Sequence, residues 1–152
     1  FDRYGNQNLS AFGPLQHPTR QMFGVRGAPG NTINHTTSYW VGNHTPRVFC
    51  DHVDVVSGIG WDKVEPANPA YRFVDVYRVV SNLGVFDFHG PGHTLRAVSL
   101  HPGITPQDVR ANTSFEVHDV DDAPPTRLPS GAELELIRRI DPKSLRDREI
   151  KL

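Results

Sequence analysis

FGVRGAPGNTINH, residues 23–35, is the stretch of this 152-residue chain in which an apolar run, a glycine-rich turn and a positive charge coincide. The β-prone residues 21–25 lead into it as a strand, and the glycines and proline of residues 27–30 then force a turn. Asn31 and Thr32 are suited to cap whatever follows the turn. A strand, a tight turn and a capped segment predict a ligand-binding loop, because glycines let backbone N–H groups approach a ligand closely.

Arg26 supplies the charge of this loop. Its guanidinium is a fixed cation with a planar fork of donors, which suits a carboxylate or a developing negative charge. The alternative is that residues 23–35 only connect a strand to a helix and that Arg26 is solvated. Isolated glycine-rich turns are weak signals, so the residues by themselves leave both interpretations open.

Size and composition fit one ordinary domain with a real core. A net charge of -1 gives no global basic field, which argues against nucleic acid and anionic membrane as partners. No signal peptide and no apolar run of membrane-spanning length is present, and the single cysteine, Cys50, excludes an internal disulfide and fits a cytoplasmic location. The chain lacks an initiator Met, and we expect a fragment or processed chain whose N-terminal portion is missing or supplied elsewhere.

Strands alternating with short helices predict an α/β fold over residues 1–152. Two helix starts carry clear caps: Thr105 precedes a short helix that ends around Asn112, and Ser130 precedes the clearest helix, residues 132–140. Residues 119–131 form a connector rich in Pro and Asp that leads to this last helix. Few long helices accompany the strands, so a partner segment or subunit is expected to cover part of the sheet. The β-prone segments are residues 47–50, 52–57, 71–80, 85–88, 95–100 and 114–118, whereas residues 36–42 show no clean periodicity.

Other reactive side chains favour ordinary structural roles. The eight histidines form no H-E-x-x-H or H-x-H pattern and there is no cysteine pair, so no metal site is predicted. Ser57 lacks the first glycine of a G-x-S-x-G elbow, which removes support for a serine hydrolase. Cys50 is interpreted as a buried small residue and Asp87 as a strand residue facing a polar loop.

Several stretches together resemble the C-terminal half of the β subunit of family I coenzyme A transferases. They occur in the family's order and cover nearly the whole chain: residues 2–8 (DRYGNQN), 26–31 (RGAPGN), 81–88 (SNLGVFDF), 100–105 (LHPGIT) and 109–116 (VRANTSFE). Within the family, the sequences of residues 24–35 and 141–149 resemble those of the branch of steroid ring-opening hydrolases.

The resemblance implies an open, mostly parallel sheet with flanking helices, of which the N-terminal part is absent here. It also implies an α subunit as partner, in an α2β2 heterotetramer, and an acyl-CoA thioester as substrate, with no other cofactor. In the hydrolase branch a carboxylate of the α subunit acts as base, and water opens a ring of a steroid-derived keto-acyl-CoA by cleaving a carbon–carbon bond. The alternatives are a β subunit that moves CoA between carboxylic acids and a structural subunit that completes the α subunit's site.

Two departures from the family pattern favour the hydrolase. Ordinary transferases carry a catalytic glutamate ahead of the Asp-x-x-Gly-Asn turn with which this chain begins. Their substrate loop resembles Gly-Ser-Gly-Gly-Ala-Asn, whereas this loop has Arg26 before it and Pro29, which lacks an N–H donor, within it. We therefore expect Arg26 to stabilise a developing enolate or to hold a substrate carboxylate. The expected substrate-binding residues are Gly27, Gly30, Asn31, Asn34 and His35, although plain turn or packing roles are favoured for His35.

Overall fold

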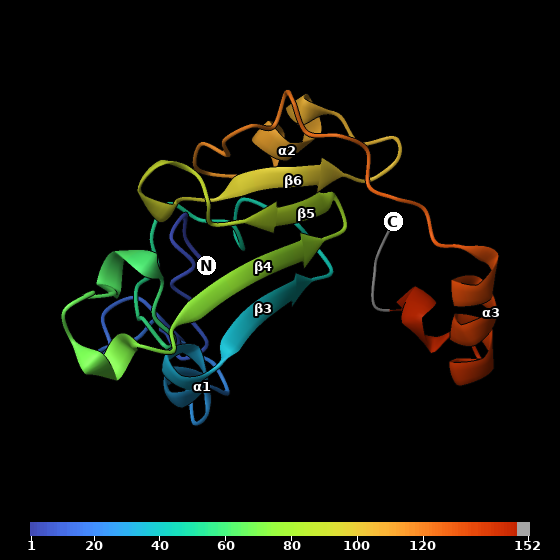
Figure 1. The fold of residues 1–152 in the computed structure, drawn as a ribbon. Helices are drawn as coiled ribbons and strands as arrows, with labels where there is room; N and C mark the ends of the chain where they lie inside the picture. Colours follow the sequence, from blue (N-terminus) through green and yellow to red (C-terminus); the bar gives the residue numbers. More distant parts are fainter. Residues whose placement is uncertain (149–152) are drawn as a thin grey trace.

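The central sheet has four strands in the order β3-β4-β5-β6 (Figure 1). The computed structural model describes residues 1–148, and its strands are β3 (Thr36–Val41), β4 (Asp75–Ser81), β5 (Gly84–Asp87) and β6 (Arg96–Leu100). β3 and β4 are parallel, whereas β4, β5 and β6 pair antiparallel. The α/β class is confirmed, but the sheet is mixed rather than mostly parallel. Short connections join β4, β5 and β6, and such connections allow only antiparallel neighbours.

The remaining elements are short and surround this sheet. A hairpin of two short strands, β1 (Ala11–Phe12) and β2 (Arg20–Gln21), precedes α1 (Ala28–Asn34). α2 (Pro106–Ala111) lies beyond β6, and α3 (Gly131–Ile140) stands apart from the sheet (Figure 1). Single 3-10 turns are formed by η1 (Trp61–Lys63), η2 (Pro69–Tyr71), η3 (Pro91–His93) and η4 (Leu145–Arg148).

The helix caps predicted at Thr105 and Ser130 are confirmed. Thr105 and Asp108 form a capping box at α2, and Ser130 and Glu133 form another at α3. β6 lies where the alternating residues 95–100 predict a strand, and β4 and β5 lie within or close to the predicted residues 71–80 and 85–88. Residues 36–42, for which the sequence predicted neither helix nor strand, contain the edge strand β3.

Other predicted strands are wrong. Residues 47–50 and 52–57 form turns instead, because their backbone groups bond to the N-terminal segment: Cys50 N donates to Phe1 O and Ser57 N donates to Gln7 O. Residues 114–118 contribute only an isolated bridge from His118 to β6. The connector also bonds to β6, since Leu100 N donates to Pro124 O at 3.0 Å. These residues therefore cover the outer edge of β6.

The core lies between the sheet and the loops that cross it. Phe49, Phe86, Phe88 and Leu95 are almost completely buried, and Val109 brings α2 into the same cluster. Burial of such side chains is the main favourable term in folding. The core thereby fixes the sheet, and the sheet carries the N-terminal hairpin and α1 at one end (Figure 1).

Candidate active site loop

α1 begins earlier than the sequence predicts. Gly27 is its N-cap, with no side-chain cap bond, and Pro29 occupies one of the first helical positions. Proline is preset for the first turn of a helix, so the helix includes the residues that were expected to form the turn. Asn31 and Thr32 therefore lie inside α1 rather than capping it. The predicted strand over residues 21–25 is also shorter, because β2 ends at Gln21.

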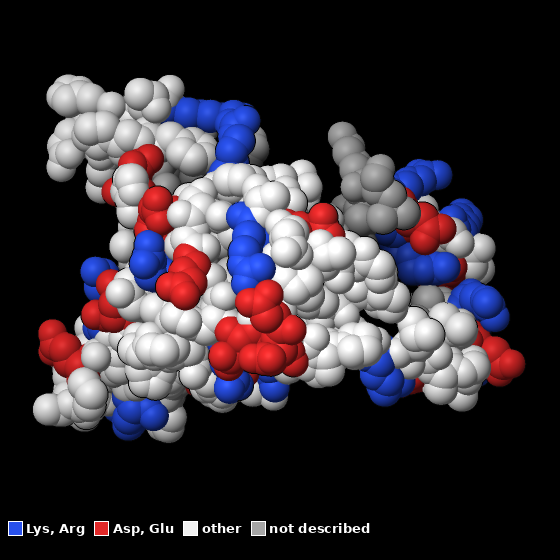
Figure 2. All heavy atoms as spheres, turned by 90° about the horizontal axis from the view of Figure 1, so that it is seen from above, with Lys and Arg blue, Asp and Glu red and all other residues white. Residues whose placement is uncertain are grey.

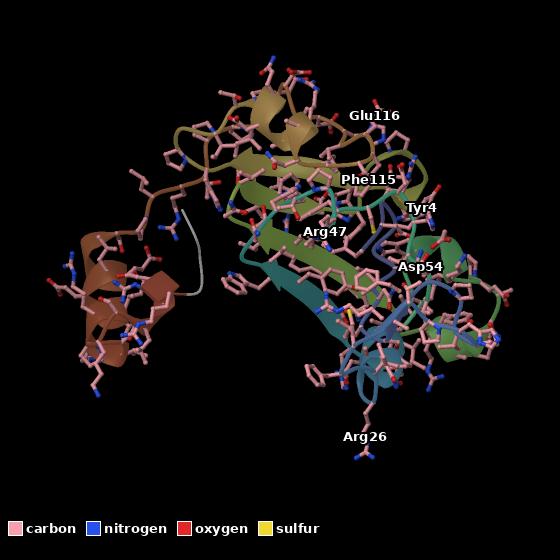
Figure 3. The ribbon with its side chains drawn as sticks, turned by 180° about the vertical axis from the view of Figure 1, so that it is seen from behind. Tyr4, Arg26, Arg47, Asp54, Phe115 and Glu116 are labelled. Atoms are coloured by element: carbon pink, nitrogen blue, oxygen red, sulfur yellow. The ribbon has the colours of Figure 1, made fainter. Side chains whose placement is uncertain are left out.

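Arg26 lies at the tip of the loop between β2 and α1, and its side chain points away from the body (Figure 3). It is exposed and forms no ion pair with any residue of the described part, residues 1–148. The loop that carries it is nonetheless anchored: Met22 N donates to Ser10 O and Gly24 N donates to Leu9 O, both at 2.8 Å. The structure thus holds a cation outward on a fixed backbone.

The predicted glycines follow directly after Arg26. A Cβ atom added at Gly30 would meet nothing within 4 Å, and one added at Gly27 would meet only the Asn31 amide at 3.7 Å. Packing within residues 1–148 therefore demands neither glycine. The N–H groups of the first helical turn have no acceptor within a helix, and Pro29 offers no donor at all. Asn31 N already donates to Gly27 O at 3.0 Å, so any backbone donor for a ligand would come from Gly27, Ala28 or Gly30.

Asn31, Asn34 and His35 are exposed on the same short helix. The Asn34 amide donates to Gly30 O at 2.9 Å, and His35 is the C-cap, whose backbone N donates to Asn31 O at 3.0 Å. Sequence proximity thus brings all six candidate residues to one end of the molecule. Whether these residues bind substrate stays a prediction.

Two apolar cavities lie beside the loop. Met22, Phe12 and Val53 line the first, of about 410 Å³, with Arg47 and Asp54 among its polar residues (Figure 3). Tyr39 and Trp40 line the second, of about 490 Å³. The two cavities share Phe1, Asn8 and Val48. Apolar surface and the exposed cation of Arg26 therefore occur on neighbouring parts of the chain.

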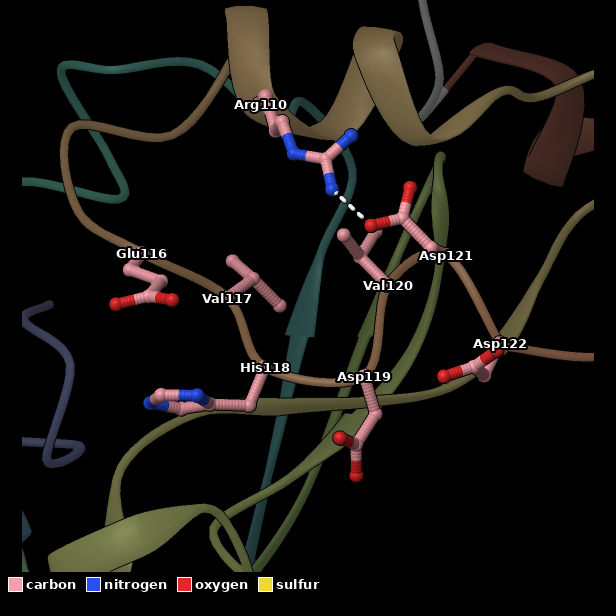
Figure 4. A pocket seen from close by; sticks show the side chains of 8 residues that line it. All are labelled: Arg110, Glu116, Val117, His118, Asp119, Val120, Asp121 and Asp122. Carbon is pink, nitrogen blue, oxygen red and sulfur yellow. Dashed lines mark hydrogen bonds and ion pairs between the residues drawn. The ribbon is translucent and has the colours of Figure 1, made fainter.

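A third cavity, of about 420 Å³, is acidic and lies on a different part of the molecule. Arg110 forms an ion pair with Asp121 within it (Figure 4). Seen from above, carboxylates gather in a compact patch on the side of the molecule where α2 lies (Figure 2). Such a surface repels an anionic ligand, so we do not assign the substrate to it. The cavity is lined by Arg110, Glu116, Val117, His118, Asp119, Val120, Asp121 and Asp122.

The buried ionisable groups away from the loop are structurally satisfied. Asp87, which was expected to face a polar loop, is 2% exposed and accepts bonds from Arg96 at 2.8 and 3.0 Å. Burial raises the pKa of Asp87, but the hydrogen bond from Arg96 and that from His89 N together bring it below its ordinary value. Cys50 is half-buried and unpaired. Within residues 1–148, no group of three or more His, Cys, Asp or Glu side chains is placed to hold a metal ion.

The Asp-x-x-Gly-Asn turn that contributes to the resemblance is built on Asn6, which is 1% exposed. Its amide nitrogen donates to Asp2 Oδ2 at 2.9 Å and to Asp62 Oδ1 at 2.7 Å, while its oxygen accepts from Gly60 N. Gly5 has a φ of 88°, a conformation that glycine adopts readily. This turn ties the first residues of the chain to the segment after residue 58.

The resemblance to β subunits of the coenzyme A transferase type is confirmed by comparison with known proteins. The chain is 78% identical over 151 residues to the cholesterol ring-cleaving hydrolase IpdB subunit of Mycobacterium tuberculosis, covering 99% of this chain and 60% of that protein. It superimposes with a TM-score of 0.97 and 70% identity on the Rhodococcus jostii RHA1 IpdAB crystal structure, over 99% of this chain and 61% of that one.

Glutaconate coenzyme A-transferase from Acidaminococcus fermentans shares the fold more distantly. Its TM-score is 0.78 at 27% identity, with 90% of this chain and 53% of that chain covered. No protein-family model matches the sequence. The chain spans about 60% of the length of the curated relatives that it matches. No helix within residues 1–148 is long and apolar enough to cross a membrane.

Proposed function

We propose that the chain is part of the β subunit of a heteromeric CoA-thioester hydrolase that opens a ring of a steroid-derived keto-acyl-CoA by carbon–carbon bond hydrolysis. The observation that carries this proposal is the 78% identity, over nearly the whole chain, to subunits named as cholesterol ring-cleaving hydrolases. No cofactor other than the CoA of the substrate is invoked. The proposed location is the cytoplasm, which the unpaired thiol of Cys50 fits.

Arg26 is the proposed catalytic residue of this chain. Hydrolysis of a carbon–carbon bond leaves an electron pair on carbon, which a neighbouring carbonyl group stabilises as an enolate. A guanidinium that forms no ion pair within residues 1–148 is available either to that enolate or to a substrate carboxylate, and its effect increases where water is excluded. Gly27 and Gly30 shape the loop and supply backbone donors. The backbone N–H of Asn31 already donates to Gly27 O at 3.0 Å, so Asn31 is a binding candidate through its side-chain amide, with Asn34 and His35 as further candidates. The base is assigned to the α subunit.

The proposed partner is that α subunit, in an α2β2 assembly. Large apolar side chains exposed on this chain support a subunit contact, because monomeric proteins rarely expose extended apolar surface. Trp40 on β3 is 59% exposed, and Phe23, next to the loop of Arg26, is completely exposed. A partner seated at this end of the molecule places its base beside Arg26. Neither nucleic acid nor membrane is part of the proposal.

The experiment that tests the reaction uses the full-length subunit co-expressed with its α partner. The complex is incubated with a steroid-derived cyclic acyl-CoA in heavy-oxygen water, and the products are weighed by mass spectrometry. Ring-opened acyl-CoA that carries solvent oxygen is the expected product. Transfer of CoA to an added carboxylic acid with the ring intact would overturn the proposal in favour of a transferase, which the likeness to glutaconate coenzyme A-transferase keeps as the second candidate. Hydroxylamine trapping distinguishes the two, since only the transferase needs a covalent glutamyl thioester.

Arg26→Ala tests the role of the loop. Loss of the cation is expected to lower turnover of the assembled complex by about 100-fold or more, the usual cost of removing a transition-state donor. Arg20→Ala is the matched control, because Arg20 is also exposed and lies in β2, six residues earlier. Equal turnover of the two variants would leave this chain as a structural subunit that completes the α subunit's site.

A further inference from the structure

Ser57 is a buried serine that neither a catalytic motif nor the proposed reaction uses. It is 2% exposed, and its hydroxyl oxygen accepts a hydrogen bond from Leu9 N at 2.9 Å. The same hydroxyl is hydrogen-bonded to the hydroxyl of Ser10 at 2.8 Å. A serine hydroxyl can hold both contacts at once because it has one proton and two lone pairs. Ser57 therefore fixes two consecutive residues of the N-terminal segment.

Those two residues hold the segment between β2 and Arg26. Leu9 O accepts from Gly24 N, and Ser10 O accepts from Met22 N. The contact at Gly24 is close enough that a Cβ atom there would lie 2.2 Å from Leu9 O. Arg26 follows Gly24 by two residues, so the position of residues 9 and 10 sets the position of the loop in front of Arg26.

The residue after Ser57 supports the other side of the loop. A Cβ atom on Gly58 would lie 2.8 Å from the γ-methyl group of Thr32, which shows how closely α1 packs against this point. Thr32 is completely buried, and its hydroxyl donates to Ala28 O at 3.0 Å. Gly58 in turn is held by Gln7, whose N–H donates to Gly58 O at 3.0 Å. Ser57 thus supports the segment before Arg26 through residues 9 and 10, and Gly58 lies against the helix after it.

We propose that Ser57 and Gly58 form a seat that positions the Arg26 loop, and that Ser57 is a positioning residue for the reaction at that loop. The inference rests on the proposed function in assigning a catalytic role to Arg26. Its mechanical part, that the Ser57 hydroxyl orders residues 22–34, is independent of the reaction. A small displacement of a catalytic group is enough to lower a rate strongly, even when the change lies far from the chemistry.

The test combines activity with amide hydrogen exchange, in the assembled full-length complex. Ser57→Ala is compared with Ser114→Ala, which also removes one hydroxyl hydrogen bond, from Ser114 to Pro46 O, at an exposed position outside the loop. We expect Ser57→Ala to speed exchange in residues 22–34 and to lower kcat/KM by about tenfold. Ser114→Ala is expected to do neither. Unchanged exchange of residues 22–34 in Ser57→Ala would overturn the seat.

A double-mutant cycle separates positioning from a general loss of structure. If Ser57 acts through Arg26, Ser57→Ala has little further effect on turnover in an Arg26→Ala background. An equal fold-loss in both backgrounds would overturn the positioning role. If Arg26→Ala alone keeps full activity, the proposed function of Arg26 fails, while exchange in residues 22–34 still tests the seat.

Ser10→Ala decides the question if Ser57→Ala does not assemble. It removes one of the two contacts of the Ser57 hydroxyl but leaves the Leu9 N–H satisfied. The expected result is a smaller loss of kcat/KM, about threefold, that again disappears in the Arg26→Ala background. Exchange and turnover equal to the unmodified complex would contradict the proposal.

Discussion

At the scale of single residues, His44 is a polar side chain that is buried in the core with both ring nitrogens hydrogen-bonded. Its ring stacks on Phe49 with centroids 3.3 Å apart, and it is 2% exposed. Thr113 donates its hydroxyl proton to Val109 O, so Nε2 of His44 donates to Thr113 Oγ1. Ser81 accepts from Leu83 N and gives its own proton to Nδ1 of His44. This pattern requires a neutral imidazole.

Burial lowers the pKa of His44 from 6.5 to about 3. Between these two values the unfolded chain takes up a proton that the folded chain does not, so the free energy of unfolding falls as pH falls from 6.5 toward 3. Above pH 6.5 the group is neutral in both states and contributes no pH dependence. We expect a loss of about 2 kcal/mol between pH 7 and pH 5, measured by urea unfolding of the full-length subunit.

The control for this prediction separates His44 from the other histidines. His44→Gln should show a flatter pH dependence over the same range, whatever its stability at pH 7. His17→Gln changes an exposed histidine and should keep the steep dependence. Equal slopes in the two variants would mean that His44 does not carry the effect.

A substitution at Gly30 tests helix stability and substrate binding separately. It lies inside α1 with open space where a side chain would be, and glycine within a helix costs about 1 kcal/mol relative to alanine. Gly30→Ala should therefore stabilise the subunit slightly. The new methyl group should raise KM severalfold if substrate approaches this backbone. Gly131→Ala, at an equally open position at the start of α3, should leave KM unchanged, and an unchanged KM in Gly30→Ala would remove Gly30 from the binding residues.

At the scale of elements, the features that depend on neighbouring residues could be predicted from the sequence, whereas the pairing of distant segments could not. The capping boxes of α2 and α3 each depend on two residues three positions apart, and both form. β3 escaped prediction because it is an edge strand whose residues alternate between exposed and partly buried, and its partner β4 lies some 39 residues further along the chain. The β-prone residues 52–57 bond to the N-terminal segment instead of joining the sheet.

The candidate site likewise has a part that the sequence predicts and a part that it does not. Arg26, the glycines and the turn are consecutive, so one stretch of sequence was enough to predict that they lie together. The support at Ser57 was not predictable, because its partner Leu9 lies 48 residues away and no motif joins the two. Gly24 and Gly58, whose close contacts such a seat requires, are the local hints that the sequence offers at this site.

α3 offers a test of an isolated element. Ser130 Oγ accepts from Glu133 N, and Arg127 holds the Glu133 carboxylate through two bonds of 2.8 and 3.0 Å. The hydrogen bond from Arg127, followed by those from Ser130, lowers the pKa of Glu133 to about 2. Ser130→Ala should speed amide exchange in residues 131–140 about fivefold, the usual effect of losing a cap. Because α3 stands apart from the sheet, β4 to β6 should not change (Figure 1).

Ser38→Ala, on the exposed side of β3, is the control for α3. It should leave exchange in residues 131–140 as it is. If Ser130→Ala also speeds exchange throughout the sheet, then α3 is coupled to the core and its separation in the fold is misleading.

At the scale of the whole molecule, the two edges of the sheet differ. The residues around His118 and Pro125 cover β6, whereas nothing in residues 1–148 pairs with the free edge of β3. An uncovered edge strand is a template for pairing with another segment. Trp40 lies on β3 and is 59% exposed, so this unpaired edge strand also presents a large apolar side chain. The proposed subunit contact predicts that association buries Trp40.

The two tryptophans allow this burial to be measured directly. Trp61 is already fixed, because its Nε1 donates to Val76 O at 3.0 Å and its ring stacks on His93. Binding of the α partner to the full-length subunit should therefore shift fluorescence to shorter wavelength through Trp40 alone. Trp40→Phe should abolish the shift and Trp61→Phe should retain it, in preparations in which the partner's tryptophans and any in the rest of the full-length subunit are replaced. Two outcomes would mean that the partner does not cover this edge: retention of the shift in Trp40→Phe, or emission at short wavelength before the partner is added. The proposed contact would then have to lie on other apolar surface, such as that around Phe23.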